Sequence, residues 1–213
     1  MYDNNYHYDY VPKSEYEPIK KELVEIIHEL QDAVRDYFTI DFRFVGSASR
    51  NMITCDYSQN KGYDFDINLF PNDDDEEYSA EEIRSLLFER IKRICFRYGF
   101  NKCENSTRVI TIKKIDRNRS RIEHSCDFAV VFNGKDGQQY IRLNKKTIPN
   151  TYTWEFQPKG YNGIDEKAEV LKENHLSEMK EIYLAKKNSI KNKDKKSLAL
   201  YVETINELWQ KYY

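Results

Sequence analysis

Several features that would place this 213-residue chain in a common class are missing from it. It has four cysteines and four histidines but no Cys-x-x-Cys pair, which argues against a structural zinc site and predicts reduced, mostly buried thiols. No stretch approaches the ~18 consecutive apolar residues of a transmembrane helix, and the opening MYDNNYHYDY is too polar for a secretory signal. We therefore expect a cytoplasmic protein without a membrane partner.

An excess of charge of one sign is also missing. The chain has 34 basic and 36 acidic residues, so its formal net charge is −2 at pH 7. This balance excludes the overall positive field of a nucleic-acid-binding domain and the composition of an acidic disordered chain, so any contact with nucleic acid needs a local patch. Aromatic residues are abundant, with 17 Tyr and 11 Phe, and predict a core that includes many large rings.

Hydrophobic periodicity predicts helices and strands in alternation. Ser14 and Glu17 fit a capping box for a first helix that runs to about Phe38, and Ser79 and Glu82 fit another for a helix that stops at Gly99. A short helical turn is expected between 48 and 53, and a loop over 54 to 62. Alternating apolar residues predict strands at 39–45, 63–70 (closed by Pro71), 106–115, 121–132 and 138–143. Two further helices are expected at about 165–188 and 195–211, after a polar loop over 145–163 that contains aromatic residues.

This order of elements predicts an α+β (α/β) fold. We expect a mixed or antiparallel sheet with helices on one face over residues 1–144, followed by a loop and a helical C-terminal lobe over 145–213. The sequence has no internal repeat and specifies no oligomeric state.

Three aspartates stand out on the predicted strands. Asp64 and Asp66 lie at i and i+2 and therefore project from one face, while Phe65 points to the other. Asp127 interrupts an apolar strand, where a carboxylate costs free energy unless it is paired or bound to a metal. Upstream, Gly46 and Ser47 end a strand and would let the backbone and a hydroxyl approach a phosphate closely. Carboxylates of this kind can share two Mg²⁺ ions in phosphoryl or nucleotidyl transfer.

The pattern resembles the DNA polymerase beta-like nucleotidyltransferase superfamily. The resemblance rests on Gly46-Ser47-Ala48-Ser49-Arg50, Asp64-Phe65-Asp66 and Asp127, and it covers roughly residues 39–132. It is closest to the minimal nucleotidyltransferases and to the group with oligoadenylate synthetases and bacterial second-messenger synthases.

The resemblance implies a nucleotidyltransferase that moves a nucleoside monophosphate from an NTP to an acceptor hydroxyl and releases pyrophosphate. It implies two Mg²⁺ ions, with Mn²⁺ as a substitute, held by Asp64, Asp66 and Asp127, which would also be the catalytic residues. Gly46, Ser47 and Arg50 would bind the nucleotide. The acceptor stays open between a small molecule, an RNA end and a protein side chain.

Other interpretations of these residues remain open. The fold could serve a catalytically idle binding, antitoxin or regulatory protein. A basic hairpin formed by Arg117, Arg119 and Arg121 either contacts phosphates or is only solvated. The aromatic residues of the later loop either stack on a base or, as we favour, pack within the protein; they are Trp154, Phe156 and Tyr161. The acidic run at 73–77 is read as a solvated loop rather than a Ca²⁺ site. His124, on the face opposite Asp127, is read as structural.

Overall fold

The computed structural model describes residues 6–56, 58, 62–73, 76–147, 149–157 and 163–213. Its helices are α1 (Lys13–Val34), α2 (Gly46–Ser49), α3 (Ala80–Arg97), α4 (Ile164–Asn188) and α5 (Ser197–Tyr212), with a 3₁₀ turn, η2, at Ile190–Asn192. Its strands are β1 (Asp9–Tyr10), β2 (Thr39–Val45), β3 (Thr54–Cys55), β4 (Tyr63–Asn72), β5 (Lys102–Asn105), β6 (Val109–Asp116), β7 (Arg121–Gly134), β8 (Gly137–Asn144) and β9 (Thr151–Phe156).

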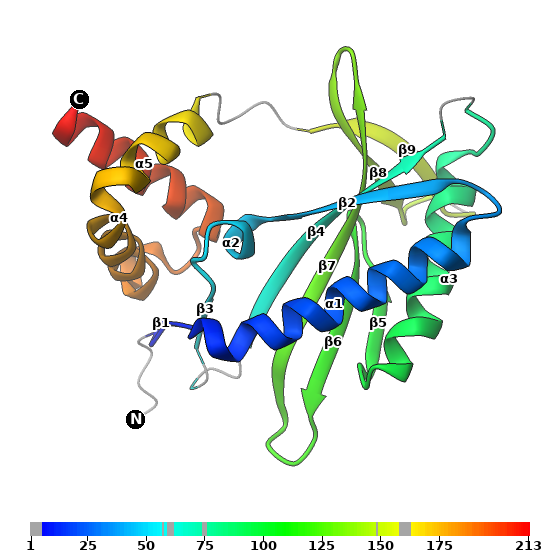
Figure 1. Cartoon of the computed structure of the whole chain (residues 1–213), viewed down its shortest axis with the longest axis horizontal. Helices are drawn as coiled ribbons and strands as arrows, with labels where there is room; N and C mark the ends of the chain where they lie inside the picture. The colour runs from blue at the N-terminus through cyan, green and yellow to red at the C-terminus, as the bar shows by residue number, and fades with distance from the viewer. Residues whose placement is uncertain (1–5, 57, 59–61, 74–75, 148, 158–162) are drawn as a thin grey trace. The chain divides into compact units, whose positions relative to one another are not determined.

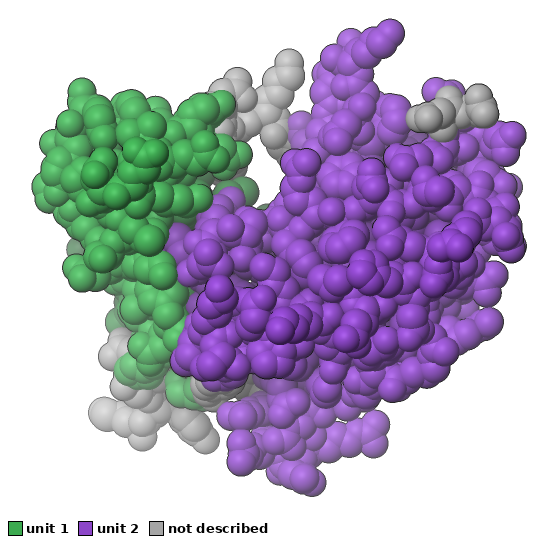
Figure 2. Space-filling model, in the orientation of Figure 1, with its two compact units in different colours: residues 1–10, 54–61, 158–213 green, residues 11–53, 62–157 purple. Residues whose placement is uncertain are grey.

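The chain forms two compact units (Figure 2). The larger one comprises Val11–Ile53 and Gly62–Gln157, and the smaller one comprises Met1–Tyr10, Thr54–Lys61 and Pro158–Tyr213. The predicted division into a catalytic core over 1–144 and a loop with a helical C-terminal lobe over 145–213 stays a prediction.

A mixed sheet forms the body of the larger unit (Figure 1). Its strands run in the order β2-β4-β7-β6-β5, and β8 and β9 extend it from β7. The pair β4–β7 is parallel, and the other pairs are antiparallel. Helices α1 and α3 pack on each other and against the sheet. The predicted α+β class with a mixed sheet is therefore confirmed.

Strand β4 shows why one face of the sheet is buried. Phe65, Ile67 and Leu69 are fully buried, whereas the alternate residues Asp64 and Asp66 point to the other face. Because successive side chains of a strand point in opposite directions, burying these apolar residues places the two carboxylates on the side away from the core.

Both predicted boundaries of α3 are confirmed, whereas the predicted start of α1 is wrong. Ser79 caps α3 as expected: its hydroxyl accepts a hydrogen bond from the Glu82 N–H at 3.3 Å, and the Glu82 carboxylate accepts one from the Ser79 N–H at 2.8 Å. Gly99, with φ +80°, follows the last turn of α3 as predicted. The capping box at Ser14 is wrong, because the Pro12 carbonyl accepts the first helical hydrogen bonds and α1 begins at Lys13.

Three strand predictions are also corrected. Strand β4 continues through Pro71 to Asn72, because its pairing with β7 ends at Leu69 and a proline without an N–H is tolerated where only β2 is a neighbour. Strand β5 was not predicted. Strand β9 lies within the segment expected to be a loop, and it contains Trp154, whose ring lies 6.1 Å from that of Phe132. Tyr161 lies outside the described residues.

The smaller unit combines α4 and α5 with the short antiparallel pair β1–β3. Both helices were predicted within a few residues. The Tyr10 hydroxyl donates to the Lys180 carbonyl at 2.8 Å, and the Asn188 amide exchanges two hydrogen bonds with the backbone of Tyr8, so the N-terminal segment is bound to α4. Within the described ranges, no helix is long and apolar enough to cross a membrane.

A fully buried arginine joins α3 to the sheet in the larger unit. Both Nε and Nη2 of Arg84 donate to the Asn105 side-chain oxygen, at 3.0 and 2.9 Å, and the carbonyls of Ser106 and Arg108 accept further bonds at 3.2 Å. Burial lowers the pKa of Arg84 to about 10. The planar guanidinium therefore satisfies four bonds that lysine's single ammonium cannot reproduce.

We expect Arg84→Lys to lower the free energy of unfolding by about 3 kcal/mol, because a buried charge loses most of its acceptors. Urea denaturation measures the loss. Arg35→Lys is the matched control, since the Arg35 side chain is 72% exposed. Equal losses in the two variants would contradict the structural role assigned to Arg84.

Candidate functional site

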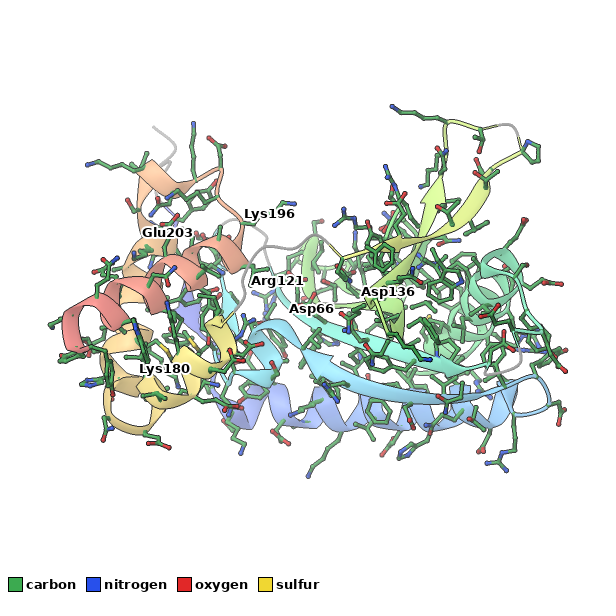
Figure 3. All side chains as sticks on the ribbon, turned by 90° about the horizontal axis from the view of Figure 1, so that it is seen from above. Asp66, Arg121, Asp136, Lys180, Lys196 and Glu203 are labelled. Atoms are coloured by element: carbon green, nitrogen blue, oxygen red, sulfur yellow. The ribbon has the colours of Figure 1, made fainter. Side chains whose placement is uncertain are left out.

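The parallel pair β4–β7 brings the three predicted carboxylates onto one face of the sheet. Asp64 pairs with Ser125 and Asp66 pairs with Asp127 across the two strands. Neighbouring strands lie about 4.8 Å apart, so Asp66 and Asp127 are direct neighbours while Asp64 projects from the same face two residues away. Asp66, which belongs to the larger unit, is labelled in Figure 3.

The three carboxylates repel one another. Burial, followed by the charges of Asp127 and Asp64, raises the pKa of Asp66 from 3.8 to about 6, and the charge of Arg50 opposes this rise. Burial also raises the pKa of Asp127, against the effects of a hydrogen bond from Thr111 and the charge of Lys113. The face therefore concentrates negative charge in a half-buried position, which is the electrostatic condition for binding a cation.

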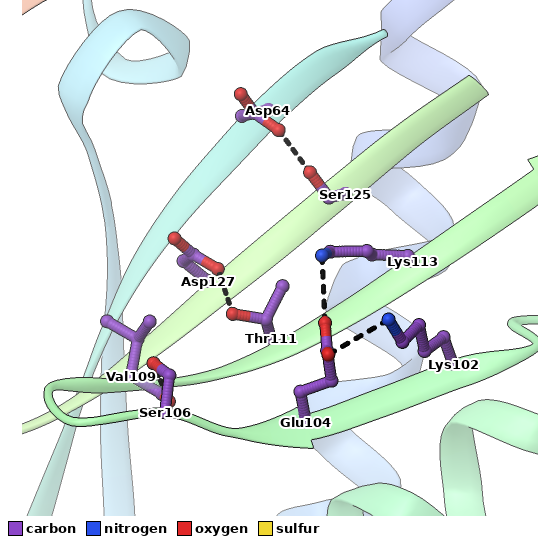
Figure 4. A network of polar contacts seen from close by, with 9 residues as sticks. All are labelled: Asp64, Lys102, Glu104, Ser106, Val109, Thr111, Lys113, Ser125 and Asp127. Atoms are coloured by element: carbon purple, nitrogen blue, oxygen red, sulfur yellow. Dashed lines mark hydrogen bonds and ion pairs between the residues drawn. The ribbon is translucent and has the colours of Figure 1, made fainter. Parts of the chain in front are cut away.

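Two hydroxyls hold the outer carboxylates (Figure 4). The Thr111 hydroxyl on β6 donates to Asp127 Oδ1 at 2.6 Å, and the Ser125 hydroxyl on β7 donates to Asp64 Oδ1. Sequence reasoning did not assign a role to either residue. The only signal available was alternation, which puts Thr111 and Ser125 on the polar faces of their strands without saying which carboxylate each would meet.

A charged group lies beside these hydroxyls on the same face. Lys113 pairs with Ser125 in the sheet, and Glu104 accepts from Lys113 at 2.8 Å and from Lys102 at 2.9 Å (Figure 4). Hydrogen bonds from these two lysines lower the pKa of Glu104. Lys113 is thus already paired with a carboxylate of its own.

Gly46 lies directly against the carboxylates. Val45 pairs with Asp66, so the chain turns into α2 at this point with Gly46 at φ +64°. A Cβ atom on Gly46 would lie 2.3 Å from Asp66 Oδ2, far inside contact distance. Only glycine fits here, both for the backbone angle and for the space.

Ser47 and Arg50 follow in α2 and the residue after it. The Ser47 carbonyl accepts from the N–H groups of Arg50 at 3.3 Å and of Met52 at 3.0 Å, which closes the turn. Arg50 is close enough for its charge to lower the pKa of Asp66. The structure therefore gathers Gly46, Asp64, Asp66 and Asp127 in one place, with Arg50 within electrostatic reach.

The donor set suits a hard divalent cation, because Mg²⁺ and Mn²⁺ prefer carboxylate oxygens. In the part of the chain that the structure describes, no three His, Cys, Asp or Glu side chains already form a metal cluster. The residue types thus fit the implied metal, while ligation itself stays a prediction.

The other candidate residues occupy different surroundings. His124 is buried on the opposite face, stacked on Tyr63 at 5.7 Å and edge-on to Phe100 at 5.5 Å. Burial, with a smaller effect from Lys114, lowers the pKa of His124 to about 4, so the ring is neutral at pH 7, in keeping with a structural role.

The acidic run and the basic hairpin have local partners. Asp73 accepts from the N–H groups of Glu77 and Tyr78, both at 3.0 Å, in the loop before α3, and residues 74–75 lie outside the described ranges. In the basic hairpin, Arg119 lies 3.6 Å from Asp116. A role of this hairpin in binding phosphate stays a prediction.

Comparison with known proteins identifies the fold. No family model matches the sequence, and no curated protein matches it. Among solved structures, Escherichia coli DncV in a 3′-deoxy GTP-bound form matches with a TM-score of 0.58 and 12% identity, over 96% of this chain and 55% of that chain. E. coli MS115-1 CdnC with ATP matches with a TM-score of 0.55 and 13% identity, over 93% and 61%. GTP-bound Vibrio cholerae DncV matches with a TM-score of 0.53 and 15% identity, over 92% and 52%.

These neighbours belong to the DNA polymerase beta-like nucleotidyltransferase superfamily. The resemblance drawn from Gly46, Ser47 and the three aspartates is thus confirmed at the level of the fold. The chain spans little more than half the length of the solved structures described above.

One prediction from this site concerns the contact between Gly46 and Asp66. Gly46→Ala should lower the free energy of unfolding by more than the roughly 1–3 kcal/mol of backbone strain alone, because the new methyl group meets Asp66 Oδ2. Gly99→Ala is the matched control, with φ +80° and its nearest non-local atom at 3.8 Å. In an Asp66→Ala background, Gly46→Ala should cost only the free energy of backbone strain, because the methyl group no longer meets a carboxylate. Strictly additive losses of unfolding free energy would show that the two residues do not collide.

Another prediction concerns the raised pKa of Asp66. Because the folded-state pKa of about 6 lies above the ordinary value of 3.8, stability is highest below pH 3.8 as far as this group is concerned, and it falls as the pH rises through 6. Asp66→Asn should remove this fall and, without divalent cations at pH 8, raise the free energy of unfolding by up to about 3 kcal/mol. Thermal unfolding of both proteins from pH 5 to 8 in a chelator measures the difference, and parallel curves would show that the pKa of Asp66 is not raised in the folded protein.

Proposed function

We propose that this protein is a metal-dependent nucleotidyltransferase. It transfers a nucleoside monophosphate from an NTP to an acceptor hydroxyl, with release of pyrophosphate. The observation that carries the proposal is the placement of Asp64, Asp66 and Asp127 on one face of two parallel strands, with Gly46 against Asp66. The nucleotidyltransferase fold supports it, as do the GTP, 3′-deoxy GTP and ATP named for the neighbouring structures.

Asp64, Asp66 and Asp127 would hold two Mg²⁺ ions, with Mn²⁺ as a substitute. When bound, such ions supply charge stabilisation at the reacting phosphate and lower the pKa of the attacking hydroxyl. The protein's contribution is to keep three ionised carboxylates together despite their repulsion. Burial, followed by the charges of Asp127 and Asp64, raises the pKa of Asp66, and a divalent cation would relieve the part that comes from repulsion.

The remaining residues would position the nucleotide. The missing side chain at Gly46 lets the backbone pass directly against Asp66, and the Ser47 hydroxyl and Arg50 would contact the phosphates as hydrogen-bond donors. Asp127, with one oxygen held by Thr111, would accept a hydrogen bond from the acceptor hydroxyl and align it for in-line attack. Together these contacts fix the two reactants in one orientation.

The acceptor stays open between a small molecule, an RNA end and a protein side chain, because one fold serves many acceptors. The test is transfer of label from each of the four α-³²P NTPs with Mg²⁺ or Mn²⁺, in reactions with protein alone, total RNA or a metabolite extract. Asp66→Ala should reduce transfer by at least about 100-fold, since the site loses its central carboxylate. The matched control is Asp36→Ala, which removes an exposed aspartate after α1 and should leave transfer unchanged.

A second measurement separates an enzyme from an idle binding protein. NTP and Mg²⁺ together should raise the melting temperature of the wild-type protein more than either alone, and Asp66→Ala should abolish the added effect of Mg²⁺. A metal-independent shift, together with no label in any fraction, would favour a catalytically idle binding or regulatory protein instead.

A further inference from the structure

Among the described residues, each of the outer two carboxylates accepts a side-chain hydrogen bond at one of its oxygens. Thr111 donates to Oδ1 of Asp127, and Ser125 donates to Oδ1 of Asp64. The carboxyl torsion of an aspartate is broad, so without a partner the group has no single orientation. We propose that Thr111 and Ser125 are positioning residues, which fix Asp127 and Asp64 so that the second oxygen of each can reach a divalent cation. This inference rests on the proposed function.

The chemistry of the donor supports this role. A hydroxyl is neutral, so it orients a carboxylate and favours its ionised form without cancelling its charge. A lysine in the same place would form an ion pair and compete with the cation. Lys113, which lies on this face, is instead bound to Glu104 at 2.8 Å, and Glu104 also binds Lys102. The arrangement leaves the aspartate cluster its negative charge.

The register of the strands makes the pairing specific. Thr111 lies opposite Asp127 in the antiparallel pair β6–β7, and Ser125 lies opposite Asp64 in the parallel pair β4–β7. Each hydroxyl thus comes from the strand next to its carboxylate. Ser125 is 7% exposed, so little water is available there to replace its hydrogen bond.

Asp66 is oriented in a different way. Among the described residues, no hydrogen bond to its carboxylate is found, and its Oδ2 instead fills the space that a side chain at Gly46 would take. The central carboxylate is thus placed by packing and the outer two by hydroxyls. Removing a hydroxyl should therefore weaken cation binding without removing a ligand.

The test compares Thr111→Val, which replaces the hydroxyl by a methyl group, with Thr111→Ser, which keeps it. Mn²⁺ binding to the whole protein is measured by electron paramagnetic resonance, which needs no acceptor. Thr111→Val should weaken Mn²⁺ binding by about 10- to 100-fold, the range known for outer-shell partners of metal ligands, whereas Thr111→Ser should stay within about threefold of wild type. Half-saturating Mg²⁺ for transfer should rise in parallel.

Thr39→Val is the matched control, because Thr39 also has a hydroxyl bonded across the sheet, to Asn72 at 3.0 Å, but at the other end of β4. If Thr111→Val binds Mn²⁺ as tightly as Thr39→Val, the positioning role is overturned while the proposed function stands. If the wild type and Asp66→Ala bind Mn²⁺ equally, the proposed function itself is overturned. Should Thr111→Val fail to fold, Ser125→Ala decides the matter, with a loss of Mn²⁺ affinity of the same size expected and wild-type affinity overturning the inference.

Discussion

The parallel pairing of β4 with β7 is the constraint on which the site depends. It places Asp66 beside Asp127 and Asp64 beside Ser125, and it does so because Phe65, Ile67 and Phe128 are buried on the other face. A slip of one residue in β4 would turn two carboxylates into the core and expose its apolar residues. The hydrophobic core therefore holds the register, and the register assembles the carboxylates.

This arrangement has an energetic cost that other contacts must offset. Burial and the charges of Asp127 and Asp64 raise the pKa of Asp66, and Gly46 adopts a backbone angle that other residues rarely take. Unfavourable backbone angles and clustered like charges occur at functional sites more than elsewhere in proteins. The surrounding core supplies the stability that compensates for them. Here the compensation comes from the aromatic and aliphatic core beneath the sheet and from contacts such as those of Arg84.

Much of the fold follows from local pattern. The strand over 39–45 and the cap of α3 at Ser79 were predicted because alternation and capping chemistry act over a few residues. Strand β9 was not predicted: its six residues alternate polar and aromatic side chains, but the segment is short, has no fully buried residue and lies in the sequence between Pro149 and Pro158. The start of α1 was misplaced because the backbone carbonyl of Pro12, rather than a side chain, begins the helix.

By itself, the sequence determined that Asp64 and Asp66 share a face, that Asp127 lies on an apolar strand and that Gly46 ends another, since each is a property of neighbours along the chain. The tertiary structure decided which strands lie side by side. Only that choice brings Asp127 to Asp66, Thr111 to Asp127 and Ser125 to Asp64, because pairing between strands far apart in the sequence depends on how the whole core packs.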